Sequence, residues 1–110
     1  MTPVWFDEGL SFTAVSAGAS HTCGVTAAGA AYCWGYNADG ELGDGTNIGQ
    51  PRPVRVTGSA GFTVVSVGQS HSCGVAGAGT LYCWGLNGLG QLGDGTTIIR
   101  NVPVRVLGQP

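Results

Sequence analysis

Short alternations of apolar and polar residues, separated by glycine-rich turns, are the main pattern along this chain. Residues 12–17 alternate with a period of two, which is typical of a β-strand with one covered face. Apolar and aromatic residues mark two further runs at 21–26 and 30–35, and a fourth run covers 54–57. No segment combines helical periodicity with helix caps. The pattern therefore predicts four short strands and a long connection before the last one.

The same pattern occurs twice, because the chain matches itself at an offset of 50 residues without a gap. Residues 12–60 align with residues 62–110, and 29 of the 49 aligned pairs are identical. Units this similar are expected to share one structure. We therefore predict an all-β chain, with one four-stranded antiparallel unit in residues 12–61 and a second in residues 62–110.

The N-terminal segment, residues 1–11, holds one more possible strand. Pro3-Val4 aligns with Pro53-Val54, which stands at the start of the fourth predicted strand. The segment carries Asp7 and Glu8 and no basic residue, so it does not have the pattern of a secretory signal.

Composition excludes some classes of partner. The chain has 43% hydrophobic residues, which argues against disorder, but no apolar run approaches the roughly 20 residues that span a bilayer. Four arginines and no lysine stand against six acidic residues, for a net charge of −2. Nucleic acid is therefore not expected as a partner, and neither is a membrane surface.

A set of motif residues recurs in both units. It comprises a glycine turn before a histidine, a Trp-Gly pair, and a loop with the pattern Asn-x-x-Gly-x-Leu-Gly. The residues are Gly18, His21, Trp34, Gly35, Asn37, Gly40, Leu42 and Gly43, and then Gly68, His71, Trp84, Gly85, Asn87, Gly90, Leu92 and Gly93. Over residues 12–110 this combination resembles the regulator of chromosome condensation repeat family. The resemblance implies a β-propeller of four-stranded blades, usually seven in the family, whereas this chain has two repeats.

The motif histidines admit a functional and a structural interpretation. His21 and His71 are either metal ligands or bases, or they tie a turn to backbone groups. No carboxylate or nucleophile recurs beside them, and a histidine needs a positioned partner for catalysis. We therefore expect a structural role, no catalytic or cofactor-binding residues, and a protein that is not an enzyme.

Two further groups of residues have alternative interpretations. The run 37–41 places oxygen ligands at alternate positions as a calcium loop does, but 87–91 lacks both carboxylates. A turn is therefore favoured over a calcium site, and no metal residues are expected. Trp34 and Trp84 either form a ligand-binding or light-absorbing cluster or pack between blades, and we expect packing.

The four cysteines flank two predicted turns symmetrically. Counting outward from the turn at residues 27–29 makes Cys23 and Cys33 a non-hydrogen-bonded pair, as Cys73 and Cys83 are around their own turn. Such pairs bring Cα atoms to about 4.5 Å, near the short end of disulfide geometry. We predict both disulfides, in an extracellular or other oxidising compartment. Reduced, packed cysteines are an alternative, and the absence of a Cys-x-x-Cys pattern disfavours zinc.

Five apolar positions per repeat are expected to be buried. They are Val15, Val25, Tyr32, Trp34 and Leu42, together with the residues 50 positions later.

The most favoured function is that of a protein-interaction scaffold. The long connections 36–52 and 86–102 would present a surface to an unidentified protein, with specificity where 49–52 differs from 99–102. A blade buries its faces only against neighbours, so copies are expected to join, with three or four chains in a closed ring. The alternative is an architectural unit that builds a ring or fibre, as a natural or engineered fragment of a longer array.

Overall fold

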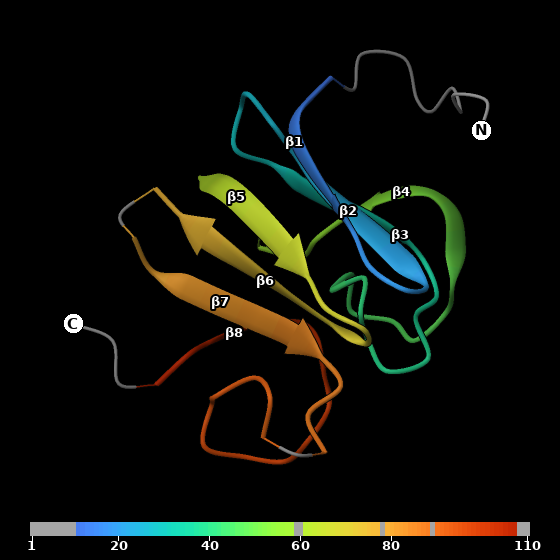
Figure 1. Ribbon diagram of the computed structural model, residues 1–110, viewed down its shortest axis with the longest axis vertical. Coiled ribbons are helices and arrows are strands. Elements are labelled where there is room, and N and C mark those ends of the chain that lie inside the picture. The colour runs from blue at the N-terminus through green and yellow to red at the C-terminus, as the bar shows by residue number, and fades with distance from the viewer. Residues whose placement is uncertain (1–10, 59–60, 78, 89, 108–110) are drawn as a thin grey trace.

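A computed structural model of the chain describes residues 11–58, 61–77, 79–88 and 90–107, and the strand predicted at Pro3-Val4 lies outside them. Within these ranges all regular structure is β-strand, arranged as two four-stranded antiparallel sheets that lie side by side (Figure 1). In this part of the chain no helical segment has the length and apolarity needed to cross a bilayer.

Each sheet is a meander in which every strand pairs with the next one in sequence. The orders are β1-β2-β3-β4 and β5-β6-β7-β8, and we call the two sheets blade 1 and blade 2. The bounds are β1 (Phe12–Ala17), β2 (His21–Thr26), β3 (Ala31–Gly35), β4 (Gln50–Arg55), β5 (Phe62–Val67), β6 (His71–Ala76), β7 (Leu81–Gly85) and β8 (Arg100–Arg105). The prediction of an all-β chain with two four-stranded antiparallel blades is confirmed.

The fourth strand is longer than predicted. The prediction covers residues 54–57, but β4 begins at Gln50, which pairs with Gly35 across a register shift in β3, and it ends at Arg55, before the predicted end. The prolines in this segment are compatible with pairing because β4 is an edge strand, where one side of the backbone needs no partner within the sheet.

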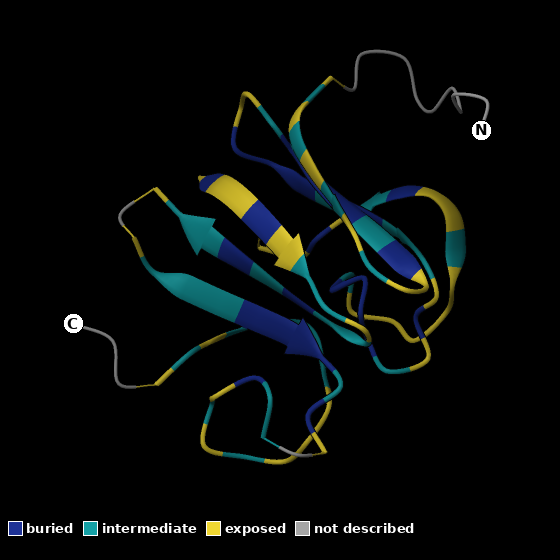
Figure 2. Ribbon diagram, in the orientation of Figure 1, coloured by how far each residue is buried: buried dark blue, intermediate teal, exposed yellow. Residues whose placement is uncertain are grey.

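Each blade has one face against the other blade, the inner face, and one face turned away from it, the outer face (Figure 2). Blade 1 covers its inner face with Cys23, Val25 and Ala31, and these pack in one core with Phe62 and Trp84 of blade 2. The outer face of blade 1 carries the row Val15, Gly24 and Tyr32, which are directly opposite one another in β1, β2 and β3. The equivalent row in blade 2 is on the inner face.

Equivalent residues of the two blades are buried to different extents because of this asymmetry. The prediction that Val15 is buried is wrong. Val15 is 56% exposed, whereas the equivalent Val65 is only 9% exposed, because blade 1 lies against Val65 and the described residues form no blade beside Val15. Of the other expected core residues, Val25, Leu42, Trp84 and Leu92 are buried, and Tyr32, Trp34, Val75 and Tyr82 are half-buried.

Candidate interaction surfaces and the joint between blades

A buried asparagine organises each long loop. The side-chain Nδ2 of Asn37 donates hydrogen bonds to the carbonyl oxygens of Thr46 and Ile48, both at 3.0 Å. Its Oδ1 accepts a hydrogen bond from the backbone N–H of Leu42 at 2.9 Å. Asn87 makes the equivalent three bonds in blade 2. One amide side chain therefore ties the two ends of each loop together and fixes the short turn between them.

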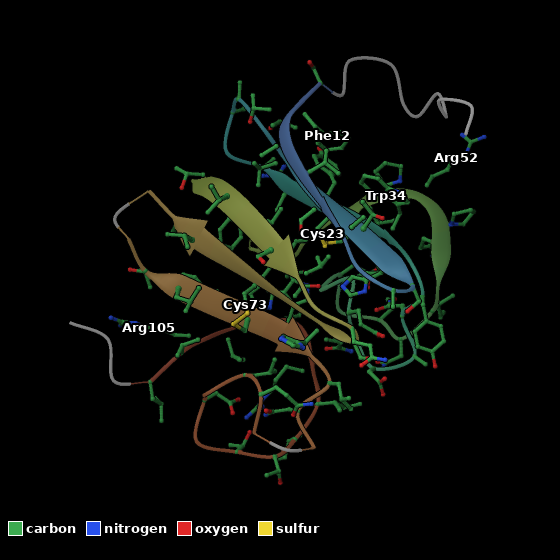
Figure 3. The ribbon with its side chains drawn as sticks, in the orientation of Figure 1. Phe12, Cys23, Trp34, Arg52, Cys73 and Arg105 are labelled. Atoms are coloured by element: carbon green, nitrogen blue, oxygen red, sulfur yellow. A yellow bond between two sulfur atoms is a disulfide. The ribbon has the colours of Figure 1, made fainter. Side chains whose placement is uncertain are left out.

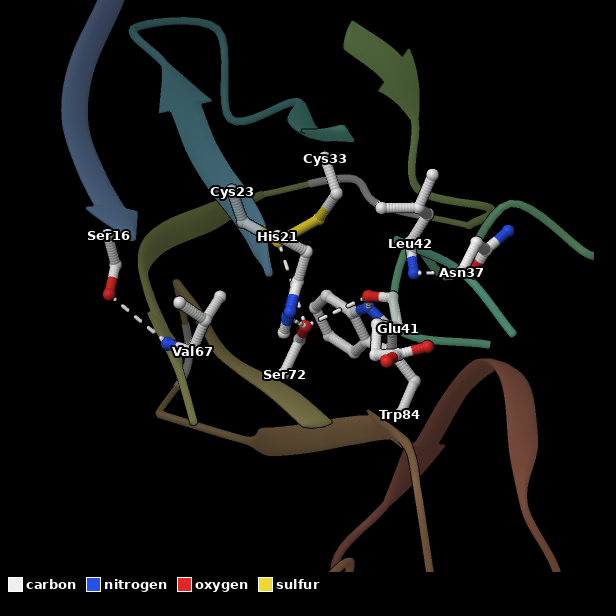
Figure 4. The surroundings of a disulfide bond; sticks show 10 residues. All are labelled: Ser16, His21, Cys23, Cys33, Asn37, Glu41, Leu42, Val67, Ser72 and Trp84. Carbon is white, nitrogen blue, oxygen red and sulfur yellow. Dashed lines mark hydrogen bonds between the residues drawn. A yellow bond between two sulfur atoms is a disulfide. The ribbon is translucent and has the colours of Figure 1, made fainter. Parts of the chain in front are cut away.

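That turn presents the carbonyl oxygen of Glu41 to blade 2 (Figure 4). The oxygen accepts a hydrogen bond from the indole Nε1–H of Trp84 at 2.8 Å and another from the hydroxyl of Ser72 at 2.9 Å. A carbonyl oxygen has two lone pairs, so blade 2 uses both. All three residues are buried, and one main-chain atom thus connects the loop of blade 1 to two strands of blade 2.

His21 completes this joint. Its Nε2 lies 2.8 Å from the hydroxyl oxygen of Ser72. Because the Ser72 hydroxyl donates its only proton to the Glu41 carbonyl, the Nε2–H of His21 must be the donor. The Nδ1 atom is buried without a hydrogen-bond partner. His21 thus connects its turn to a side chain of the next blade, a contact that the expected tie to backbone groups did not include.

Burial also determines the charge states at the joint. Burial, followed by the proximity of His71, lowers the pKa of His21 to about 4, so the ring is neutral at pH 7. Burial raises the pKa of the Glu41 carboxyl, whose Oε1 accepts a hydrogen bond from the backbone N–H of Asp39 at 2.8 Å. The Oε2 atom is buried without a partner. Burial therefore shifts both side chains toward their uncharged forms.

The calcium interpretation gains no support from this geometry. Glu41 directs one carboxylate oxygen to its own loop backbone, and it is fully buried. Among the residues that the structure describes, no three His, Cys, Asp or Glu side chains gather as metal ligands do.

The two repeat tryptophans occupy different environments. Trp84 is fully buried between the blades, and a β-carbon placed on Gly43 would lie 2.7 Å from its Nε1. Trp34 is half-buried on the outer face of blade 1, with its ring centre 5.6 Å from that of Phe12 (Figure 3). Packing between blades therefore describes Trp84, whereas Trp34 lies at the equivalent position on the outer face of blade 1, beside which the described residues form no further blade.

Part of the first long loop packs along β8. The backbone N–H of Gly45 donates to the carbonyl of Asn101 at 2.8 Å, and the Asn101 side chain donates to Oδ1 of Asn47 at 3.0 Å. The segments 49–52 and 99–102, where partner specificity was expected, thus lie largely in β4 and β8 rather than in free loops. Asn101 belongs to the joint between blades.

Other loop residues remain open to solvent. Ile48 is 67% exposed and the equivalent Ile98 is 60% exposed, and Tyr36 and Ile99 are also exposed large side chains. We call these four residues the loop-tip surface, since both loops leave the same end of the two blades (Figure 1). Exposed apolar side chains at repeated positions are typical of a protein-contact surface.

The cysteines form the disulfides Cys23–Cys33 and Cys73–Cys83, each with its Cα atoms 4.0 Å apart and directly opposite in neighbouring strands. Cys23 is buried in the joint, where its Sγ lies 3.7 Å from Ser72 Oγ. Cys73 is half-buried on the outer face of blade 2.

Two parts of the joint were not predicted from the sequence. The Ser72 hydroxyl faces blade 1 because of its strand register, and the Glu41 acceptor is a main-chain atom. Thr22, the residue equivalent to Ser72, was the available clue, because it keeps a hydroxyl at this position in both repeats.

Comparison with known families supports the repeat assignment. The family model for the Regulator of chromosome condensation (RCC1) repeat matches residues 28–75 and 78–110, and a second model of this repeat matches residues 12–41 and 62–91. The Ultraviolet-B receptor UVR8 of Arabidopsis thaliana is 43% identical over 54 residues, which is 49% of this chain and 12% of the receptor.

Solved structures show the same fold. Prp20p from Saccharomyces cerevisiae, studied with its binding to Gsp1p and histones, matches with a TM-score of 0.82 and 21% identity. Human WBSCR16 matches with a TM-score of 0.80 and 24% identity. In both cases the match covers 94% of this chain, and it covers 27% and 28% of those proteins. The chain thus spans under a third of the β-propellers that it resembles.

Proposed function

Because this chain belongs to the regulator of chromosome condensation (RCC1) repeat family, we propose that it is a non-catalytic protein-interaction module of the β-propeller type. The observation that carries the proposal is the loop-tip surface, where apolar side chains such as Ile48 and Ile98 stand exposed at equivalent positions. The hydrogen bonds of Asn37 and Asn87 hold these loops in fixed shapes, so little conformational entropy would be lost on binding.

Structural relatives support a protein partner. Prp20p was studied with its binding to Gsp1p and histones, and the same yeast protein was solved bound to Kap60. The net charge of −2 gives this chain no basic surface for phosphates, so we propose an unidentified protein as its partner rather than nucleic acid or a membrane. The two disulfides favour an oxidising compartment, such as the extracellular space.

The test is capture of partners by immobilised protein, with variants at the loop tips. Ile48→Asp and Ile98→Asp together should abolish capture, because charge would replace both exposed apolar contacts. Ala28→Asp is the matched control, since Ala28 is exposed in the turn at the opposite end of blade 1. Equal capture by the double variant and the control would reject the loop-tip surface as the binding site.

A second candidate function is architectural, and the exposed outer faces favour it. Val15 on blade 1 and Val64 on blade 2, which is 49% exposed, are apolar positions that a neighbouring blade would cover. We propose that further copies of the chain cover them, in a ring of three or four chains or in a fibre. Light scattering at rising protein concentration tests this, and a constant single-chain mass would contradict it.

A further inference from the structure

We propose that the outer face of blade 2 binds the outer face of blade 1 in a second copy, head to tail, through the same contacts that join the two blades within one chain. This inference rests on the assembly proposed above and specifies which faces meet and which residues pair. Its basis is that the residues on each side of the internal joint have equivalents 50 residues away in the sequence, on the two outer faces.

The outer faces are chemically matched to the inner faces already in contact. In blade 1 the inner face buries His21 and Cys23, and the equivalent His71 and Cys73 of blade 2 are half-buried on its outer face. On the other side, the inner face of blade 2 buries Phe62, Val65 and Trp84. Their equivalents Phe12, Val15 and Trp34 form the outer face of blade 1. Each face that has no neighbouring blade among the described residues thus repeats a face that is covered elsewhere in the same molecule.

The buried hydrogen bonds of the joint can also be repeated between copies. Within the chain His21 donates to the hydroxyl of Ser72. Between copies His71 would meet the hydroxyl of Thr22, the equivalent residue. The Trp84 indole donates to the carbonyl of residue 41, and a main-chain carbonyl is equally present at Gln91 for Trp34 of the second copy.

Close packing around the indole is preserved as well. Gly43 has a φ of +67° and leaves room for Trp84, and Gly93 has the same φ of +67°. A β-carbon on Gly93 would meet only Val106 of its own blade, at 3.1 Å. The space that Gly43 leaves for an indole is therefore present again beside Gly93, where Trp34 of the second copy would enter.

One contact of the internal joint has no equivalent between copies. The side chains of Asn101 and Asn47 are hydrogen-bonded within the chain, but the equivalent positions carry Pro51 and Thr97. This bond is exposed, and its loss removes little binding free energy. The joint between copies should accordingly be weaker than the internal one, and its formation should depend on concentration.

The position of His71 indicates what must move when the faces meet. A β-carbon on Gly68 would lie 2.6 Å from Cε1 of His71, so this ring lies over its own turn. No ring atom of His21 comes as close to the equivalent Gly18, and that ring reaches across to blade 2. We expect His71 to turn outward toward Thr22 of the second copy on binding.

Complementation between two variants tests the polarity of the joint. Val15→Asp places a charge on the outer face of blade 1, and Val64→Asp places one on the outer face of blade 2. Each change should raise the dissociation constant for self-association by about tenfold or more, because an unpaired charge would be buried. Mixed together, the variants should form a one-to-one dimer that does not grow, since each retains the face that the other lacks. Ala28→Asp, in an exposed turn, should assemble as the unmodified chain does.

The full chain is used throughout, with masses from sedimentation velocity and folding checked by circular dichroism. Should an aspartate variant fail to fold, Val15→Ser and Val64→Ser replace them. A single-chain mass for the unmodified protein at every concentration would overturn this joint and leave the loop-tip proposal standing. Assembly that either variant retains alone, or a mixture that stays monomeric, would overturn the head-to-tail arrangement while leaving assembly itself in place.

Discussion

Two equivalent glycines provide a direct measure of how much the blade joint stabilises the fold. Gly43 and Gly93 share a φ of +67° and the same place in the repeat, but only Gly43 faces a tryptophan of the next blade within the chain. Substituting each by alanine imposes the same backbone strain at both positions. The difference between Gly43→Ala and Gly93→Ala therefore compares the contact with Trp84, at 2.7 Å, with the milder contact that a β-carbon on Gly93 would make with Val106, at 3.1 Å.

The magnitude follows from the contacts. A left-handed alanine costs about 1–2 kcal/mol at either position. At Gly43 the new methyl group would lie 2.7 Å from Nε1 of Trp84, which is fully buried and cannot move into solvent. Overpacking of this kind costs about 1–3 kcal/mol, and weakening the bond from Trp84 to the Glu41 carbonyl adds about 1 kcal/mol. We expect Gly43→Ala to be the more destabilising by about 2–4 kcal/mol.

Urea denaturation followed by tryptophan fluorescence measures the free energy of unfolding of both variants. The protein is kept dilute, because Gly93 would contact Trp34 of a second copy in an assembly. Equal destabilisation by the two substitutions would refute the reasoning, since it would mean that the indole of Trp84 is not held against Gly43.

Acidification and reduction give two further tests. The pKa of His21 falls from 6.5 to about 4 on folding. The neutral ring therefore makes its full contribution to the free energy of unfolding above pH 6.5, and this free energy should drop by up to about 3 kcal/mol as the pH falls toward 4. The measurement is best made in the Glu41→Gln variant, because the raised pKa of the buried Glu41 carboxyl would increase the free energy of unfolding as the pH falls. A free energy of unfolding that does not change between pH 6.5 and 4 would show that His21 is not buried in neutral form. Under mild reductant the disulfide of blade 2, in which Cys73 is partly exposed and Cys83 is buried, should be alkylated before the fully buried one of blade 1. Mass spectrometry showing the reverse order would contradict the assigned burial.

Local sequence patterns predicted most of the fold because they depend on neighbours along the chain. The alternation in β1 and the turn after Thr26 are each contained within a few residues, and the match at an offset of 50 residues extends both to the second blade. Gly29 has the left-handed φ of +84° that such a turn needs, and Thr26 donates to the Ala30 carbonyl at 3.0 Å. The cysteine pairing followed from the same hairpin.

The features that escaped prediction depend on what lies beside a residue in space. Val15 and Val65 have similar sequence contexts, FTAVSA and FTVVSV, and their different burial follows from whether a described blade covers them. The acceptor at position 41 is a main-chain oxygen, and every residue has one, so composition does not distinguish it. The early start of β4 depends on pairing with β3 beyond two prolines, which local propensity disfavours.

The carbonyl of Glu41 has a genetic consequence. Because the joint depends on a main-chain atom, the acceptor is kept when the side chain at this position changes, and the second repeat already carries Gln91 there. A duplicated 50-residue segment would bring its own donor and its own acceptor, and it would need no compensating mutation in the blade that it joins. Insertions, deletions and permutations in whole-repeat steps are thus the changes that this architecture should tolerate best.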